Sequence, residues 1–197
     1  MADGADNRAR ILSCAIHLFY QRGYDAVGVQ EIATAAGVTK PTLYYYFKSK
    51  LGLLEALLRE NCEPFCERLE QVAAGYQGEP KDTLYRLACT FVEIAQENRE
   101  LYFLLLSLNY SARENEAFKA VAPYMKRMFR ATTDFFVRAG DKLGNMNGRQ
   151  EQFAISFQGM ISHYILVMDE RGVSAEQLGN PHAIWELVRQ FMYGIYS

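Results

Sequence analysis

Residues 29–48, VQEIATAAGVTKPTLYYYFK, restrict the possible folds of this chain more than any other segment. Gly37 separates two short stretches with helical apolar spacing, at a point where a left-handed backbone can end a helix. Thr39 offers an N-cap hydroxyl, and Pro41 suits the first turn of a second helix, where its missing N–H removes no bond. The segment therefore predicts two helices joined by a tight turn, the helix-turn-helix arrangement of many DNA-binding proteins.

The second helix of this pair has an apolar face and a polar face. Leu43 and Phe47 lie four residues apart and should pack on Ile32 of the first helix. The other face carries hydroxyl and ammonium groups, which can donate hydrogen bonds to phosphates and base edges. Two adjacent tyrosines on this face would otherwise be an unexplained exposed aromatic patch. The predicted DNA contacts are Gln30, Thr39, Lys40, Pro41, Thr42, Tyr44, Tyr45, Lys48 and Lys50.

The stretch from Gly23 to Leu54, GYDAVGVQEIATAAGVTKPTLYYYFKSKLGLL, resembles the N-terminal domain of the tetracycline-repressor-like (TetR) family of bacterial transcription regulators. The shared features are Gly-Tyr after the opening helix, IA..AGV, TLYYYF and KSK. The resemblance implies a DNA-binding head followed by a helical domain that binds an effector and dimerises. Gly28 departs from the family, which usually has Ser or Thr there. Glycine is a tolerable N-cap, but it offers no hydroxyl to a phosphate.

Helical patterns continue along the whole chain without a strand or hairpin signal, so we expect an all-α fold of about nine helices. The N-terminal three-helix helix-turn-helix DNA-binding domain should cover residues 1–50, and a helical effector-binding and dimerisation domain residues 51–197. Outside the motif, the expected helices cover about 7–22, from 49 onward, 81–98, 99–110, from about 116 to 143, 149–170 and 181–196. Pro64 should kink the fourth helix or divide it in two, and Pro123 is a second candidate for a kink.

Charge and hydropathy are compatible with DNA binding without indicating it alone. The net charge of the chain is −2, but residues 1–50 carry six Lys or Arg against four acidic residues. The basic charge therefore sits at the end that carries the motif. No apolar run approaches the roughly 20 residues that span a bilayer, and the N-terminus lacks the apolar segment of a signal peptide. We expect a cytoplasmic protein that contacts no membrane.

Two helices near the C-terminus are too broadly apolar to bury all their surface against one chain, which predicts a homodimer. The alternative is a fully buried helix in a monomer. The TetR resemblance implies a four-helix interface formed by two such helices from each subunit. A two-fold dimer places two recognition helices in successive major grooves, so the operator should be near-palindromic. The predicted dimerisation residues are Phe153, Phe157, Ile161, Ile165, Trp185, Val188, Phe191 and Met192.

The middle helices are rich in aromatic residues and methionine, which core packing alone explains for most positions. The resemblance, rather than this pattern, implies an effector pocket, and we expect a small apolar or aromatic effector. His163 is the main polar group of the region, although a structural histidine is the more common case. The predicted ligand-binding residues are Phe65, Phe91, Tyr102, Phe103, Tyr124, Phe129, Phe157, Met160 and His163.

An enzymatic function has little support in the sequence. The three histidines are scattered, and there is no HExxH, phosphate-binding glycine loop or nucleophile elbow. We therefore expect no catalytic residues, no metal site and no cofactor. Cys62 and Cys66 share a helix face, which leaves a redox switch open, although buried inert cysteines are more common. The alternative to a DNA-binding repressor is an all-helical small-molecule-binding or enzymatic protein whose helix-turn-helix segment is only structural. The sequence does not distinguish repression from activation.

Overall fold

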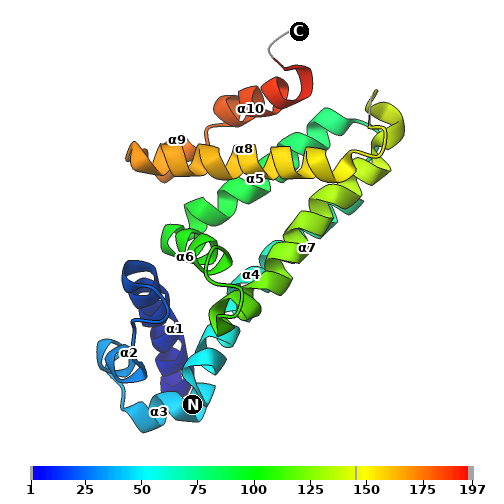
Figure 1. The fold of residues 1–197 in the computed structure, drawn as a ribbon. Helices are drawn as coiled ribbons and strands as arrows, with labels where there is room; N and C mark the ends of the chain where they lie inside the picture. The colour runs from blue at the N-terminus through cyan, green and yellow to red at the C-terminus, as the bar shows by residue number, and fades with distance from the viewer. Residues whose placement is uncertain (1, 145, 195–197) are drawn as a thin grey trace. The chain divides into compact units, whose positions relative to one another are not determined.

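The computed structural model describes residues 2–144 and 146–194, with side chains from Asp6 onward (Figure 1). Throughout this part of the chain the regular structure is helical, which confirms the predicted all-α class. The elements are α1 (Ala2–Arg22), α2 (Val29–Ala35), α3 (Lys40–Phe47), α4 (Lys50–Ala74), α5 (Pro80–Glu97), α6 (Arg99–Asn109), α7 (Glu116–Arg138), the 3-10 turn η1 (Gly140–Lys142), α8 (Gln150–Glu170), α9 (Ala175–Leu178) and α10 (Pro181–Tyr193).

Most predicted helices are confirmed, but their ends differ. The first helix was expected to begin near residue 7, whereas α1 already begins at Ala2. The helix expected to reach Leu143 ends at Arg138 and is followed by η1. The four-residue α9 was not expected, although Ser174 and Gln177 form a capping box at its start. The last helix was expected to reach Tyr196, which lies outside the described residues.

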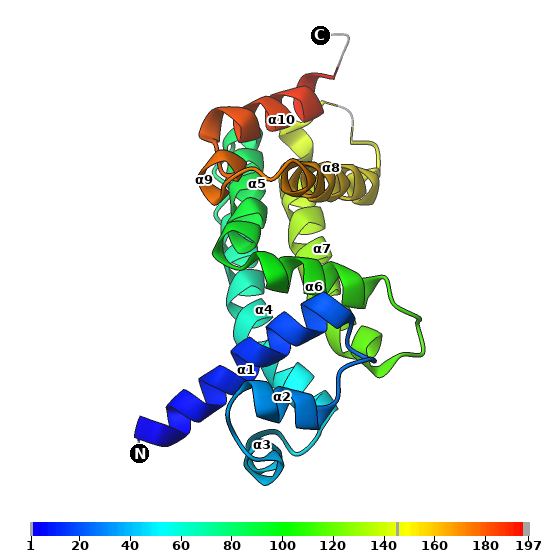
Figure 2. The ribbon, with the colours of Figure 1, turned by 90° about the vertical axis from the view of Figure 1, so that its left-hand side faces the viewer.

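The first of two compact units contains residues up to Glu63 together with Arg99–Tyr124. In it, α1 packs against α2, α3 and α6, and α2 packs against α3 (Figure 2). The apolar stripe of α1 meets the apolar faces of the helix pair, with Phe19, Ile32 and Leu43 at 0–1% exposure. Burial of this shared core fixes the orientation of α3 relative to α1 and α2.

The second unit contains Pro64–Asn98 and the residues from Met125 onward. Here α5 contacts α8, α9 and α10, and α8 also contacts α10 (Figure 1). Phe135 and Phe136 of α7, Phe157 of α8 and Val188 of α10 are at most 1% exposed. Gln158 joins α8 to α7 inside this unit, since its Nε2 donates to Met128 O at 3.0 Å and to Thr132 Oγ1 at 2.8 Å.

Two helices contain a proline and continue through the boundary between the units. Pro64 begins the part of α4 that belongs to the second unit, and Pro123 lies next to the last residue of α7 that belongs to the first. α4 runs through Pro64 without ending, so the second of the two predicted alternatives, a division into two helices, is wrong. These packing units are not the predicted domains, and a domain boundary after Lys50 stays a prediction.

Candidate nucleic-acid interface

The turn between α2 and α3 has the predicted backbone. Gly37 adopts a positive φ of 64°, and its N–H donates to Thr34 O at 3.1 Å. The next N–H, of Val38, donates to Ala33 O at 2.9 Å. A Cβ at Gly37 would meet nothing within 4 Å, so backbone conformation, not space, favours glycine here. The turn ends α2 abruptly and lets the chain enter α3.

The start of α3 is held by two threonines. Thr39 Oγ1 accepts a hydrogen bond from the backbone N–H of Thr42 at 3.3 Å, and the two hydroxyls are 2.8 Å apart. Pro41 stands in the first turn, as predicted. Leu43 is fully buried and Phe47 is 4% exposed, so the apolar face of α3 points inward. The rotation of α3 about its axis is therefore set by the core, and the polar face is left to solvent.

The solvent face of α3 combines aromatic rings with ammonium groups. Tyr45 is 73% exposed and Tyr44 38%, whereas Tyr46 is half-buried. The Nζ of Lys40 lies 5.8 Å from the centre of the Tyr44 ring, and that of Lys48 lies 5.7 Å from the Tyr45 ring. These cation–π contacts hold two positive charges beside two phenol hydroxyls. The face can thus offer hydrogen-bond donors and positive charge to a polyanion.

Lys48 has an uncommon backbone at the end of α3. Its φ is 65° and its ψ is −38°, and the N–H of Ser49 donates to Phe47 O at 2.7 Å. This i+2 to i bond around a positive φ forms a classic γ-turn, which is rare and strained for a residue with a side chain. Lys48 Nζ also donates to Tyr45 O at 3.0 Å. The γ-turn directs the chain from α3 into α4.

Two other predicted DNA contacts are engaged inside the first unit. Lys50 Nζ donates to Asp25 O at 3.3 Å and lies 4.2 Å from the centre of the Tyr24 ring. Gln30 is exposed, and its Nε2 donates to Thr34 Oγ1 at 3.5 Å. Lys50 therefore has an observed structural role, because it ties the start of α4 to the turn after α1. Whether it contacts DNA stays a prediction.

Gly52 is a residue of this region that sequence reasoning missed. It lies in the first turn of α4, and its N–H donates to the N-cap hydroxyl of Ser49 at 2.8 Å. A Cβ at Gly52 would lie 2.1 Å from the carbonyl oxygen of Phe47, the last residue of α3. α3 and α4 thus meet so closely that only glycine fits without movement. The signal available in the sequence was a glycine inside a helical pattern, where it costs about 1 kcal/mol relative to alanine and therefore suggests a packing reason.

A second missed feature joins the turn after α1 to the start of α7 within the first unit. The Tyr24 hydroxyl donates to Glu116 Oε1 at 2.5 Å, and Asn115 Nδ2 donates to Asp25 Oδ2 at 2.7 Å. Burial and the hydrogen bond to the Glu116 carboxylate both raise the pKa of Tyr24 far above its ordinary value. The partners are about 90 residues apart in sequence, so no local pattern indicates this contact.

The predicted ligand-binding residues do not surround one described cavity. Tyr102, Phe103 and Tyr124 belong to the first unit, and the other six belong to the second. Within the units, the rings of Phe65 and Phe91 are 5.8 Å apart. His163 is exposed on α8 in the single chain, so it is not a buried structural histidine. The ligand role of these nine residues stays a prediction.

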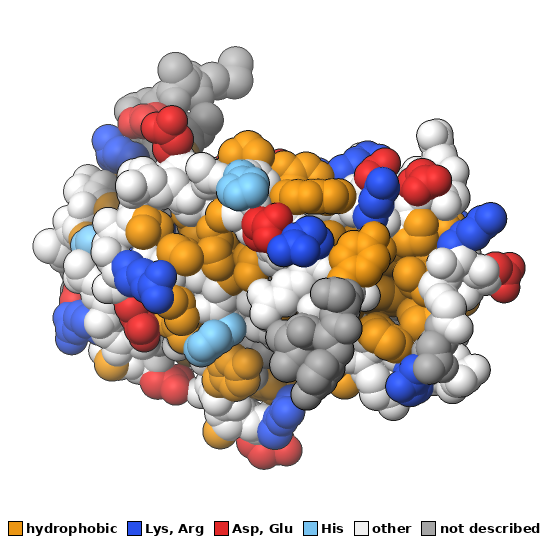
Figure 3. Space-filling view, turned by 90° about the horizontal axis from the view of Figure 1, so that it is seen from above, with side chains coloured by type: hydrophobic (Ala, Val, Ile, Leu, Met, Phe, Trp, Pro, Cys, Tyr) orange, Lys and Arg blue, Asp and Glu red, His pale blue; other side chains and the backbone are white. Residues whose placement is uncertain are grey.

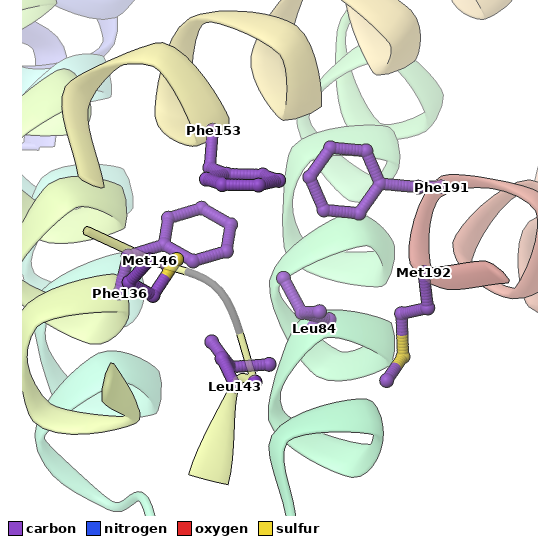
Figure 4. Close-up of a pocket in the computed structure, with 8 residues that line it drawn as sticks. Leu84, Phe136, Leu143, Met146, Phe153, Phe191 and Met192 are labelled. Carbon is purple, nitrogen blue, oxygen red and sulfur yellow. The ribbon is translucent and has the colours of Figure 1, made fainter. Parts of the chain in front are cut away.

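The second unit contains an apolar cavity of about 210 Å³. Figure 4 shows its walls, which come from α5, α7, α8, α10 and the segment after η1. Three phenylalanine rings lie close together on the wall, with centre-to-centre distances of 5.9–6.2 Å. The lining residues are Leu84, Phe136, Leu143, Gly144, Met146, Phe153, Phe191 and Met192. No predicted ligand residue is among them, although the ring of Phe157 contacts those of Phe136 and Phe191.

The predicted dimerisation surface needs correction. Phe157, Ile161, Ile165 and Val188 are at most 1% exposed within the single chain, so these side chains belong to its own core and cannot face a partner. Phe153, Trp185, Phe191 and Met192 are half-buried. The exposed apolar side chains of the two helices are Ile155 and Leu166 on α8 and Tyr193 on α10, at 61%, 36% and 56%. Figure 3 shows hydrophobic side chains in clusters between charged ones on the face seen from above.

The cysteines and hydropathy of the described residues add two facts. Cys62 and Cys66 are fully buried in α4, which leaves their thiols out of reach of an oxidant in the folded chain.

Of the helices described, none combines the length and the apolar character that crossing a bilayer requires.

Known proteins similar to this chain are regulators of transcription. Residues 11–57 match the family model of the bacterial regulatory proteins, tetR family. YvkB of Bacillus subtilis (strain 168), an uncharacterized HTH-type transcriptional regulator, is 29% identical over 157 residues, which cover 80% of each chain.

Two solved structures share the fold. The MbdR regulator from Azoarcus sp. CIB matches with a TM-score of 0.80 at 18% identity, over 96% of this chain and 98% of that one. The transcriptional regulator FadR from Bacillus subtilis, solved in complex with stearoyl-CoA, matches with a TM-score of 0.75 at 20% identity, over 95% and 98%. The match of residues 11–57 agrees with the resemblance predicted from the sequence, and this part of the chain is similar to the bacterial regulatory proteins of the tetR family.

Proposed function

We propose that this protein is a dimeric, sequence-specific DNA-binding regulator that represses transcription from a near-palindromic operator in the cytoplasm. A small apolar or aromatic effector releases it from the DNA. The observation that carries the proposal is the solvent face of α3, where Tyr44, Tyr45 and two lysines stand on a helix whose rotation is fixed by its buried face. Exposed tyrosines beside ammonium groups have a clear use on a phosphate backbone.

Within this face, the residues divide by chemistry. Thr42 is half-buried in the first turn of α3, and it can pair with a base edge or touch a thymine methyl. Tyr44 and the lysines are better suited to phosphates, which set position and overall affinity. Thr42 is therefore the proposed base contact, and Tyr44 the proposed phosphate contact.

Dimerisation would give the protein two such faces. Ile155 and Leu166 of α8 and Tyr193 of α10 are the exposed apolar side chains from which an interface can be built. In a two-fold dimer the recognition helices contact half-sites about 34 Å apart, one turn of B-DNA. This spacing is the geometric reason for a palindromic operator.

The protein has to adopt two conformers, one that fits the operator well and one that fits it poorly. An effector releases the protein from DNA only if it binds the second conformer more tightly than the first. Pro64 in α4 and Pro123 in α7 each remove one helical hydrogen bond near a boundary of the two packing units. Both helices can bend at these points, and α4 is connected directly to the end of α3. Unchanged release of DNA by the effector in a Pro64→Ala variant would count against this role for α4.

Selection of tight-binding fragments from random DNA by the purified protein tests the proposed function. A shared inverted repeat with half-sites one helical turn apart is expected. Tyr44→Phe should then weaken binding evenly across sequences, whereas Thr42→Ala should relax the preference at one base pair of each half-site. Failure to enrich any sequence, even at low salt, would contradict the proposal. The helix-turn-helix would then be a packing element of a small-molecule-binding or enzymatic protein.

A further inference from the structure

Among the residues that the structure describes, those lining the cavity of the second unit carry no charged side chain. Seven of its eight lining residues present leucine, methionine or phenylalanine side chains, and the eighth is a glycine (Figure 4). Burying an ionised carboxylate among such walls costs far more than burying an uncharged ring, because the charge loses its hydration without gaining a partner. We therefore expect an occupant to be uncharged in the part that contacts these side chains.

The wall geometry favours an aromatic occupant. Phe136, Phe153 and Phe191 form a triangle of rings whose planes are inclined by 38°, 49° and 86°. Tilted and edge-to-face arrangements at these distances are favourable, and a guest ring can extend them. Figure 4 shows the side chain of Met192 reaching from α10 along the other side of the cavity. Thioether side chains adapt their shape and contact ring edges favourably, so Met146 and Met192 can close around a flat guest.

The size of the cavity limits the guest. An apolar cavity of about 150 Å³ in another protein holds one benzene. With about 210 Å³, this cavity has room for roughly two fused rings at the same degree of filling. Arg149 is exposed and lies 5.5 Å from the centre of the Phe153 ring, without itself lining the cavity.

We propose that this cavity binds an uncharged aromatic molecule of about two fused rings. The proposal gives the effector of the proposed function a site and a chemical class, and depends on that function only for its effect on DNA. One wall residue, Phe136, stands on α7, which begins at Glu116, the partner of Tyr24 in the first unit. An occupant that displaces Phe136 therefore acts on a helix whose other end is hydrogen-bonded to the turn after α1.

The test uses indole, which is uncharged and has two fused rings, and indole-3-carboxylate, which adds a charge to the same rings. Titration of the full chain without DNA is followed by NMR of ¹³C-labelled methionine methyl groups. Indole should shift the methyl signals of Met146 and Met192 by its ring current and leave Met160, which does not line the cavity, unchanged. We expect saturable binding at one site per chain, and at least tenfold weaker binding of the carboxylate. This measurement needs no variant.

A filled variant and a matched control locate the site. Leu143→Trp places an indole ring in the cavity from its half-buried wall and should weaken indole binding at least tenfold. Val137→Trp adds the same side chain on the exposed side of α7, next to Phe136, and should leave binding within twofold. No shift at Met146 and Met192, or equal or tighter binding of the carboxylate, would overturn the proposal. Because no DNA is present, this result is independent of whether the protein reads an operator.

Discussion

Replacement of Gly52 by alanine probes the junction between α4 and α3, the proposed recognition helix. The new Cβ would lie 2.1 Å from Phe47 O, whereas ordinary contacts begin at 3.4 Å, so the two helices must separate by about 1.3 Å. The contact is with backbone, which cannot turn aside. Overpacking of this kind costs about 1–3 kcal/mol. Alanine regains about 1 kcal/mol of helix propensity, which leaves a net loss of up to roughly 2 kcal/mol.

The matched control is Gly159→Ala in the interior of α8, where the Cβ would meet nothing within 4 Å in the same chain. This variant should gain up to about 1 kcal/mol from propensity alone. Thermal unfolding at equal protein concentration should thus separate the two variants by roughly 2–12 °C, at about 2–4 °C per kcal/mol for a chain of this size. Gly52→Ala should also weaken operator binding by roughly tenfold, the equivalent of one lost base contact. A Gly52→Ala variant that gains stability as Gly159→Ala does would refute the reasoning.

Three further predictions follow from the same region and from the surface charges. Lys48→Gly relieves a positive φ and should raise the free energy of unfolding, measured by denaturant titration, by up to about 1 kcal/mol. If Lys48 contacts a phosphate, the same variant should lower the slope of log affinity against log salt concentration by about 0.9, and an unchanged slope would contradict this contact. Tyr24→Phe removes the hydrogen bond to Glu116 and should cost about 1 kcal/mol in the same titration, and full stability in this variant would show that the bond contributes nothing. The hydrogen bond from Arg68 lowers the pKa of Glu97. The ionised Glu97 therefore stabilises the fold above the unfolded-state pKa, and this stabilisation is lost as the pH falls through the folded-state pKa. Glu97→Gln should flatten the decline in Tm below about pH 5, and an unaltered decline would refute this contribution of Glu97.

Short-range signals accounted for what the sequence predicted well. Gly37, Thr39 and Pro41 each act within one turn of their own position, and the structure has all three in the expected roles. The apolar spacing of Leu43 and Phe47 likewise set the inward face of α3. Local backbone chemistry and helical periodicity are sufficient for such features, because neither depends on the rest of the fold.

Features that depend on distant contacts were not predictable in this way. The hydrogen bond from the Lys50 ammonium group to the carbonyl of Asp25 was not predicted from the sequence. The apolar residues of α8 cover more than one face of the helix, but the sequence does not show which of these faces packs inside the same chain. Phe157 was therefore predicted to contact a partner subunit, whereas it lies in the core of its own chain. The cavity walls come from five segments, and an aromatic residue at helical spacing has the same sequence pattern whether it fills a core or lines a cavity.

The most direct test of the central claim is the base-pair discrimination of Thr42→Ala on the selected operator, measured by fluorescence anisotropy against a set of single-base variants. If α3 reads DNA through Thr42, the wild-type protein should discriminate against the wrong base at one position of each half-site by about 1–3 kcal/mol. Thr42→Ala should lose the discrimination at this position and keep the discrimination at the other positions of the operator. Discrimination that stays intact at every position in Thr42→Ala would contradict this role of the recognition helix.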